Sequence, residues 1–218
     1  MELKGKIINF LGDSITEGAG TSCKEAIFHS LIKEKYGLKE ARNYGIGGTR
    51  IARQTEITSL VRDKDFILRT RMMEEDADAV VVFGGTNDFG HGQAALGTME
   101  DRDSRTFYGA LHTLIQDLIK DYYNKTIVFI TPLHRHNEDG RGAWKPDGVE
   151  QRPLKDYVYA IKEVCEYYSV PVLDLFACGE LAGNTPEWYV KYMPDGLHPN
   201  DEGHKIMAQK LGKFLENL

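Results

Sequence analysis

A serine, a histidine and an aspartate stand in short sequence blocks near opposite ends of this 218-residue chain. Ser14 lies in Gly-Asp-Ser-Ile-Thr at 12–16, and Asp195 and His198 lie in Asp-Gly-Leu-His-Pro at 195–199. A nucleophilic serine needs a base that takes its proton, and the base needs a third group that fixes its tautomer. Asp195 can reach the Nδ1 proton of His198 within this short turn and leave Nε2 for Ser14. The three residue types therefore predict nucleophilic acyl chemistry.

Two further blocks can supply hydrogen-bond donors to a negatively charged oxygen. Asn-Tyr-Gly-Ile-Gly-Gly occupies 43–48, and Gly-Thr-Asn-Asp occupies 85–88. A tetrahedral acyl intermediate needs such donors aimed at its oxyanion. Gly48 allows close backbone approach, Asn87 offers an amide that does not titrate, and the N–H of Ser14 is a third donor. The choice of Gly48 over the other glycines of its block rests only on its place in the block.

Each of these residues also has a structural interpretation. Ser14 followed by Glu17 fits a capping box, in which the serine only caps a helix. Asp13 and Thr16 are expected to hydrogen-bond the turn around Ser14, and Asp88 is expected to do the same in its own block. The occurrence of all four blocks together favours the catalytic interpretation of Ser14.

Apolar runs and amphipathic segments alternate along the chain, which is typical of an α/β domain. Strands are expected at 7–11, 41–44, 79–83, 126–131 and 170–175, and helices at 23–36, 106–123, 154–168 and 202–218. This alternation predicts a three-layer α/β/α sandwich with a central parallel sheet, formed by a single domain over residues 1–218. Ligands of such sheets bind beyond the carboxyl ends of the strands, where the four blocks lie.

Two long segments do not fit the alternation. Residues 50–78 have room for one more helix, and residues 133–152 are expected to form a lid or rim over a site. His134 and His136 lie in the second segment, but no third residue has metal-site spacing, which favours a polar rim. We expect neither a metal nor an organic cofactor.

Four aromatic residues have two interpretations that the sequence does not separate. They can form a wall for an acyl group or a sugar, or they can belong to the core. They are Trp144, Trp188, Tyr189 and Tyr192.

The composition narrows the class of protein. The net charge is −6 and the basic residues are scattered, which argues against nucleic acid and anionic membranes as partners. Cys23, Cys165 and Cys178 lie far apart and are expected to be free thiols. The N-terminal residues contain no signal-peptide or membrane-spanning segment, so we expect a cytoplasmic protein if the chain begins at its natural end. Whether it forms a homo-oligomer stays open.

The four blocks, in this order, resemble those of the SGNH hydrolases, also called GDSL esterases and lipases. The resemblance implies a flavodoxin-like sandwich with Ser14 as nucleophile and with Asp195 and His198 completing a catalytic triad. It implies an oxyanion hole formed by Ser14, Gly48 and Asn87. It also implies hydrolysis of acyl esters or thioesters of lipids, acetylated sugars or small alcohols, without a metal or cofactor.

We therefore expect a serine esterase for a small-molecule ester, with short-chain or acetyl esters favoured and carbohydrate deacetylation slightly ahead. A lysophospholipase, a thioesterase or an acyltransferase using the same site is the alternative. A carbohydrate-binding module with an inactive triad is the alternative from another class of protein.

Overall fold

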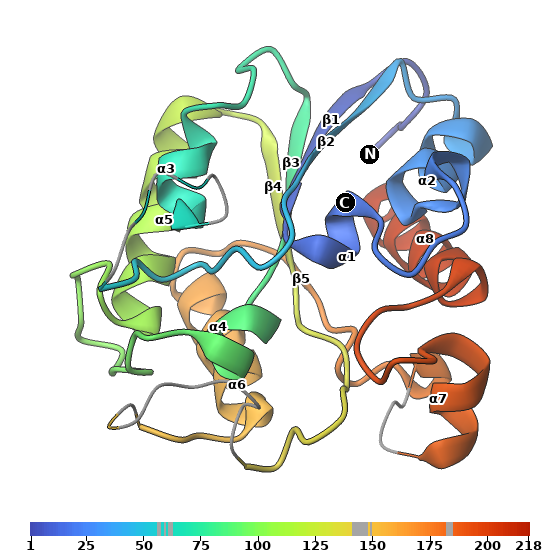
Figure 1. The fold of residues 1–218 in the computed structure, drawn as a ribbon. Coiled ribbons are helices and arrows are strands. Elements are labelled where there is room, and N and C mark those ends of the chain that lie inside the picture. The colour runs from blue at the N-terminus through green and yellow to red at the C-terminus, as the bar shows by residue number, and fades with distance from the viewer. Residues whose placement is uncertain (56–57, 59, 61–62, 141–147, 149, 182–184) are drawn as a thin grey trace.

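One parallel sheet forms the centre of the protein, in the strand order β2-β1-β3-β4-β5 (Figure 1). The computed structural model describes residues 1–218 except 56–57, 59, 61–62, 141–147, 149 and 182–184. The strands are β1 (Ile7–Gly12), β2 (Glu40–Gly45), β3 (Ala79–Phe83), β4 (Thr126–Ile130) and β5 (Val172–Leu173). All neighbouring strands pair in parallel, as the sequence predicted.

Helices cover both faces of this sheet and complete the α/β/α sandwich (Figure 1). On one face lie α2 (Phe28–Tyr36) and α8 (Asp201–Glu216), and on the other lie α3 (Phe66–Thr70), α5 (Phe107–Asp121) and α6 (Leu154–Tyr167). The shorter helices are α1 (Ser14–Glu17), α4 (Thr86–His91) and α7 (Pro186–Tyr192). Short 3₁₀ helices span Lys24–Ala26 and Gly179–Leu181. The strand order is that of flavodoxin-like folds.

Alternation of side chains along the strands builds two separate cores. In β1, Ile8 and Phe10 pack toward α2 and α8, whereas Ile7 and Leu11 pack toward the opposite layer. Every residue of β1 is buried, because helices cover the strand on both sides. The continuous apolar character of the central strands follows from this double burial.

The connections that leave the sheet near β1 and β3 run to opposite faces. The chain passes from β1 through α2 to β2 on one face, and from β3 through α5 to β4 on the other (Figure 1). Such a reversal opens a crevice at the carboxyl ends of the two strands, where ligands of open α/β sheets bind. The blocks containing Ser14 and Asn87 follow these two strands directly.

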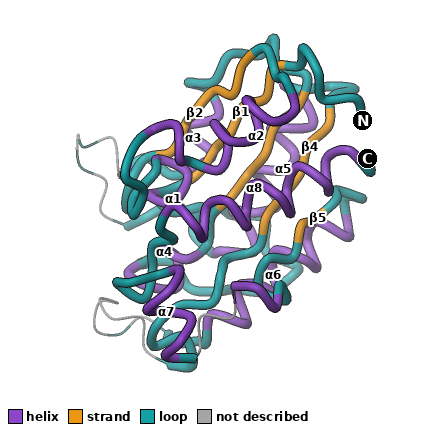
Figure 2. The backbone as a smooth tube through the Cα atoms, turned by 90° about the vertical axis from the view of Figure 1, so that its right-hand side faces the viewer, coloured by secondary structure: helices purple, strands orange, loops and turns teal. Residues whose placement is uncertain are grey.

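The two ends of the chain lie side by side (Figure 2). The terminal ammonium group of Met1 donates hydrogen bonds to the carbonyls of Leu215 and Glu216, each at 2.9 Å. The first residue is thereby attached to the end of α8.

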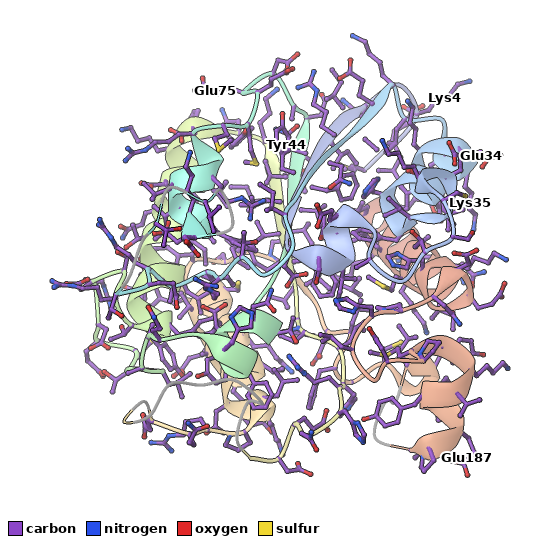
Figure 3. The ribbon with its side chains drawn as sticks, viewed as in Figure 1. Lys4, Glu34, Lys35, Tyr44, Glu75 and Glu187 are labelled. Carbon is purple, nitrogen blue, oxygen red and sulfur yellow. The ribbon has the colours of Figure 1, made fainter. Side chains whose placement is uncertain are left out.

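Charged side chains of both signs point away from the body of the protein, among them Lys4, Glu34, Lys35 and Glu187 (Figure 3). Within the part of the chain that the structure describes, none of the helices has the length and apolar character needed to cross a membrane.

Most predicted elements are confirmed to within two residues at each end, but one helix begins five residues later than predicted and one strand keeps only two of its six expected residues. The helix expected at 23–36 begins only at Phe28, because Ile27 is extended (ψ 140°) and buries its side chain. The strand expected at 170–175 shortens to Val172–Leu173. Pro171 has no N–H to donate, and the carboxylate of Asp174 already accepts the N–H of Ala177 at 3.1 Å in a turn.

The sequence did not predict α4 or α7, while α3 supplies the helix for which residues 50–78 had room. The segment 133–152 is only partly described, since 141–147 and 149 lie outside the described residues.

Candidate active site

The structure brings the side chains of Ser14, His198 and Asp195 together. Ser14 Oγ lies 3.0 Å from His198 Nε2, although 184 positions separate the two residues in the chain. His198 Nδ1 lies 2.6 Å from Asp195 Oδ2. Since a carboxylate only accepts hydrogen bonds, Nδ1 carries the proton and the lone pair of Nε2 faces the serine hydroxyl. This is the arrangement in which an imidazole can act as a base toward serine.

Ser14 is placed by the junction between β1 and α1. Asp13 caps α1, and its carboxylate accepts the N–H of Ile15 at 3.0 Å. The interpretation of Ser14 as the helix cap is therefore wrong, because Asp13 takes that role and Ser14 is the first helical residue. The N–H of a first helical residue has no acceptor within its own helix, so it remains available to a ligand.

His198 lies in the loop between α7 and α8. Two contacts fasten this loop and the first residue of α8 to the region that follows Ser14. Ser22 donates to the carboxylate of Asp201 through its N–H at 2.8 Å and its hydroxyl at 2.6 Å. Gly20 packs so closely on Pro199 that a Cβ at this position would lie 2.4 Å from the Pro199 carbonyl oxygen. These contacts set the distance between histidine and serine.

Asp195 is held in the ionised form that an imidazolium partner requires. Partial burial opposes its ionisation, but the backbone N–H and the ring of His198, together with the N–H of Leu197, outweigh that effect. The pKa of Asp195 is consequently below its usual value. The N–H of Leu197 lies 2.9 Å and that of His198 2.7 Å from Asp195 Oδ1.

The turn after β2 leaves the N–H of Gly48 available. Each neighbouring N–H group already has an acceptor. Gly45 donates to Asn43 Oδ1 and Gly47 donates to Glu17 Oε2. Ile46 donates to the Gly12 carbonyl, and Thr49 donates to the Ile46 carbonyl. Gly48 itself has φ +76°, and no atom lies within 4 Å of the position that a Cβ would take. Of the three glycines in this block, Gly48 is thus the one whose N–H can meet a ligand among the described residues.

Asn87 is buried in α4, shortly after the end of β3. Its Nδ2 donates to the carbonyl of Thr49 at 3.0 Å, which ties α4 to the turn that carries Gly48. An amide nitrogen has two hydrogens, so a second one is left for a ligand. Asn87 and Gly48 therefore lie in one hydrogen-bonded unit.

The two other acidic residues of the blocks support the backbone. Asp88 accepts the N–H groups of Ile51 and Ala52, both at 2.9 Å. Asp13 is fully buried, and this burial raises its pKa to about 6 against the lowering effects of the Ile15 N–H and of His198. Both positions agree with the structural roles expected for them.

Sequence reasoning missed Arg69, whose side chain connects the ends of β1 and β2 through hydrogen bonds. This buried side chain donates to the Gly12 carbonyl at 3.0 Å and to Thr49 Oγ1 at 2.8 Å, and also to the Tyr44 carbonyl. Burial lowers its pKa to about 10, so it remains charged at neutral pH. Arg69 lies on α3, within the segment 50–78, where no sequence pattern pointed to it.

A cavity of about 900 Å³ is lined in part by His136, which contacts Gly196 in the loop that carries Asp195. Residues 135–140 and three residues of α7, Pro186, Tyr189 and Val190, line it. His136 donates its N–H to the Gly196 carbonyl at 2.8 Å and places its ring 5.0 Å from that of Tyr189. The described part of segment 133–152 thus forms a rim beside the candidate triad.

His134 of this rim and the aromatic residues of α7 contact neighbouring side chains rather than a metal. His134 Nδ1 lies 2.7 Å from Glu138 Oε1, and the described residues contain no cluster of three or more metal-ligating side chains. The ring centroids of Trp188 and Tyr192 lie 5.1 Å apart on α7. This helix has no fully buried residue. Trp144 lies outside the described residues.

The three cysteines are free thiols, with Cys165 and Cys178 buried and Cys23 exposed.

Comparison with known proteins gives a consistent result. Residues 10–206 match the model of a family described as GDSL-like lipase/acylhydrolase. The chain is 24% identical over 228 residues to an acetylxylan esterase of Xylanibacter ruminicola, a match that covers 94% of this chain and 42% of the relative. The chain thus spans less than half the length of that curated relative.

Two solved structures share the fold over nearly their whole length. A protein of Lactobacillus plantarum is 30% identical, with a TM-score of 0.83 and 98% of each chain covered. An acetyl xylan esterase is 23% identical, with a TM-score of 0.64, and the match covers 94% of this chain and 96% of that one.

Proposed function

The chain belongs to the GDSL-like lipase/acylhydrolase family and is therefore an ester-hydrolysing enzyme, and on this premise we propose that it removes short acyl groups, acetyl above all, through an acyl-enzyme on Ser14. The observation that carries the proposal is the continuous hydrogen-bonded series from Ser14 Oγ to His198 and on to Asp195, at 3.0 and 2.6 Å. A serine so placed can lose its proton as it attacks a carbonyl carbon.

In the first half of the reaction Ser14 Oγ bonds to the ester carbon while its proton moves to His198 Nε2. Asp195 stabilises the imidazolium that forms. The carbonyl oxygen becomes an oxyanion, and the N–H groups of Ser14 and Gly48 and the amide of Asn87 bind it. His198 then gives its proton to the leaving alcohol oxygen as the bond between carbon and that oxygen breaks, which leaves the acyl group on Ser14.

In the second half a water molecule takes the place of the alcohol. The water oxygen attacks the acyl carbon while His198 accepts a proton from the water. His198 returns that proton to Ser14 Oγ when the tetrahedral intermediate collapses. The carboxylic acid leaves and the serine is restored.

The preference for acetyl groups draws on the acetylxylan esterase to which the chain is similar. An acetylated carbohydrate is the substrate class we favour, and the rim beside Asp195 offers polar and aromatic groups, including Arg135, His136 and Tyr189, for its hydroxyl-rich part.

The test is hydrolysis of p-nitrophenyl acetate, butyrate, octanoate and palmitate beside a panel of acetylated sugars, by the wild type and by Ser14→Ala. We expect the rate to fall from acetate to the longer chains and to disappear in the variant. Ser30→Ala, a serine on α2, is the matched control and should keep the wild-type rate.

Each other outcome has a definite meaning. Preference for octanoate or longer chains would reassign the enzyme as a lipase or thioesterase, and transfer of the acyl group to an added alcohol would reassign it as an acyltransferase. Full activity of Ser14→Ala would overturn the mechanism. No activity on any ester and no labelling by a fluorophosphonate probe would support the inactive binding module.

A further inference from the structure

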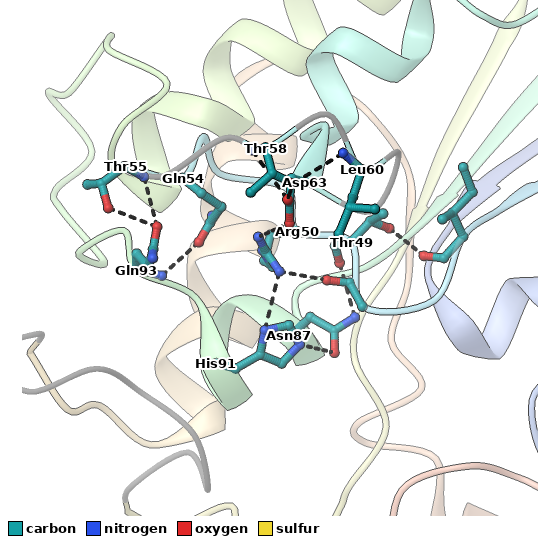
Figure 4. A network of polar contacts seen from close by, with 12 residues as sticks. Thr49, Arg50, Gln54, Thr55, Thr58, Leu60, Asp63, Asn87, His91 and Gln93 are labelled. Atoms are coloured by element: carbon teal, nitrogen blue, oxygen red, sulfur yellow. Dashed lines mark hydrogen bonds and ion pairs between the residues drawn. The ribbon is translucent and has the colours of Figure 1, made fainter.

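The orientation of the Asn87 side chain is fixed on both sides of its amide (Figure 4). Nδ2 donates to the Thr49 carbonyl at 3.0 Å, and Oδ1 lies 3.1 Å from His91 Nε2. A flipped amide would place Oδ1 against the Thr49 carbonyl, where two acceptors would repel each other. Nδ2 is therefore held toward the turn after β2, with one hydrogen remaining for the oxyanion.

The same contacts select one tautomer of His91. Because Asn87 Oδ1 only accepts, His91 Nε2 must carry a hydrogen. Arg50 Nη1, which only donates, lies 3.4 Å from His91 Nδ1, so Nδ1 must be the acceptor. Both neighbours thus require the neutral ring with its proton on Nε2.

Arg50 also holds the turn that carries Gly48. Its Nη1 donates to the Gly48 carbonyl at 3.0 Å, and its Nη2 lies 3.6 Å from Asp63 Oδ1. The Arg50 and Asp63 side chains are only 11% and 13% exposed, so little water competes for these contacts. One guanidinium thereby joins the turn with Gly48 to the helix with Asn87 (Figure 4).

We propose that His91 and Arg50 are positioning residues that hold the Asn87 amide and the Gly48 turn in the geometry that binds the oxyanion. The proposal rests on the function proposed above. Neither side chain need touch the substrate, because Arg50 acts on His91 and on the Gly48 carbonyl, and His91 acts on Asn87. A donor that is fixed before the reaction has no reorganisation cost when the charge develops.

The test compares kcat and KM for p-nitrophenyl acetate in His91→Ala and His91→Gln. Loss of a complete oxyanion donor costs roughly 10²- to 10³-fold in kcat, so a donor that is present but loosely held should cost less, about tenfold. KM should change by less than about threefold, because the oxyanion exists only in the transition state. Glutamine has both a donor and an acceptor and should restore most of kcat.

A double-variant comparison separates positioning from a merely structural role. In an Asn87→Ala background, His91→Ala should cause no further loss of kcat, since the group it positions is gone. Arg50→Met should behave in the same way as His91→Ala but with an additional loss through Gly48. If the alanine variant does not fold, His91→Met fills the space of the ring without providing a donor.

His112→Ala is the matched control, because His112, like His91, lies on a helix and makes two hydrogen bonds, to Tyr168 Oη at 3.0 Å and the Met99 carbonyl at 3.1 Å. It should lower the melting temperature and leave kcat unchanged. A wild-type kcat in Asn87→Ala would overturn the proposed oxyanion hole itself. A large loss in Asn87→Ala combined with an unchanged kcat in His91→Ala, or with fully additive losses in the double variant, would overturn the positioning proposal alone.

Discussion

The carboxylate of Glu17 accepts a hydrogen bond from the N–H of Gly47 at 2.8 Å. This contact joins the last residue of α1 to the turn after β2, so the helix that begins with Ser14 also fixes the turn that exposes the N–H of Gly48. The proposed nucleophile and one proposed oxyanion donor are thereby positioned by the same four-residue helix. The relative placement of attacking oxygen and oxyanion donor is thus a local property of α1 and the β2 turn.

Glu17→Ala should lower kcat because the turn loses the acceptor that orients it. Glu17 is exposed and water can partly replace its carboxylate, so we expect a loss of only about three- to tenfold, near the energy of one ordinary hydrogen bond. Glu17→Gln keeps an acceptor and should retain most activity. Steady-state kinetics on p-nitrophenyl acetate measures the effect, with the exposed Glu25→Ala as control, and equal rates for Glu17→Ala and wild type would refute it.

Asp195→Asn should reduce kcat far more strongly. The asparagine can still accept the N–H groups of Leu197 and His198, but its NH₂ would face His198 Nδ1 and favour the tautomer with the proton on Nε2. That ring cannot take the proton of Ser14. In a serine protease the same exchange costs about 10⁴-fold, and we expect a loss of roughly 10²- to 10⁴-fold in kcat with little change in KM.

The control for this exchange is Asp174→Asn, which alters another turn carboxylate that accepts a backbone N–H, from Ala177 at 3.1 Å. Its kcat should equal that of the wild type. An Asp195→Asn enzyme with more than a tenth of wild-type kcat would exclude Asp195 as the group that orients His198.

The sequence was sufficient to predict the sheet and to bring Ser14 and Asn87 to one edge of it. Central strands such as Ala79–Phe83 are buried on both faces and are therefore continuously apolar, which makes them easy to recognise. Ser14 and Asn87 follow β1 and β3, and parallel strands place their carboxyl ends at one edge. Because all parallel strands of one sheet end at the same edge, this prediction did not require knowing which strands are neighbours.

Contacts made from the segment 50–78, which does not fit the alternation of strands and helices in the sequence, could not be predicted in this way. Arg69 reaches the carbonyl of Gly12 across 57 positions from a segment without periodicity, and Arg50 meets His91 across 41. His91 alone carried a signal, since it lies four residues after Asn87 and such residues share a face of a helix. Because the sequence did not predict α4, the four-residue spacing of Asn87 and His91 could not be recognised as a helical contact.

Asp13→Asn should stabilise the protein at alkaline pH. The folded-state pKa of Asp13 is raised to about 6 from 3.8, chiefly by burial, so the folded protein holds this proton more tightly than the unfolded chain. The resulting stabilisation is complete below pH 3.8 and is lost as the pH rises through about 6. Above that pH the buried carboxylate costs up to about 3 kcal/mol, which a neutral asparagine cap avoids.

Urea unfolding of wild type and Asp13→Asn at pH 8 and pH 4 measures this difference. The variant should gain stability over the wild type at pH 8 and little or none at pH 4. Asp121→Asn, at the exposed end of α5, controls for removal of one negative charge. A stability difference between Asp13→Asn and wild type that does not depend on pH would contradict the buried-carboxylate explanation.

Acid should destabilise the protein through two buried histidines on α2 and α8. Burial lowers the pKa of His29 and of His204 to about 4 from 6.5. His29 Nε2 lies 3.2 Å from the Thr16 carbonyl, and His204 Nδ1 accepts the N–H of Phe28 at 3.2 Å, so both rings are neutral in the folded protein. Because the unfolded chain binds these protons more readily, stability is complete above pH 6.5 and falls as the pH drops toward 4.

Each histidine contributes a slope of at most about 1.4 kcal/mol per pH unit in that window. His29→Gln keeps a donor at the position of Nε2 and His204→Asn keeps an acceptor at the position of Nδ1, so the double variant retains both hydrogen bonds without the titration. We expect its free energy of unfolding, measured in urea from pH 7.5 to pH 4, to vary less steeply than that of the wild type. The exposed His136→Gln should keep the wild-type slope. If the double variant were as steep as the wild type, acid unfolding would have to originate elsewhere than in the packing of α2 against α8.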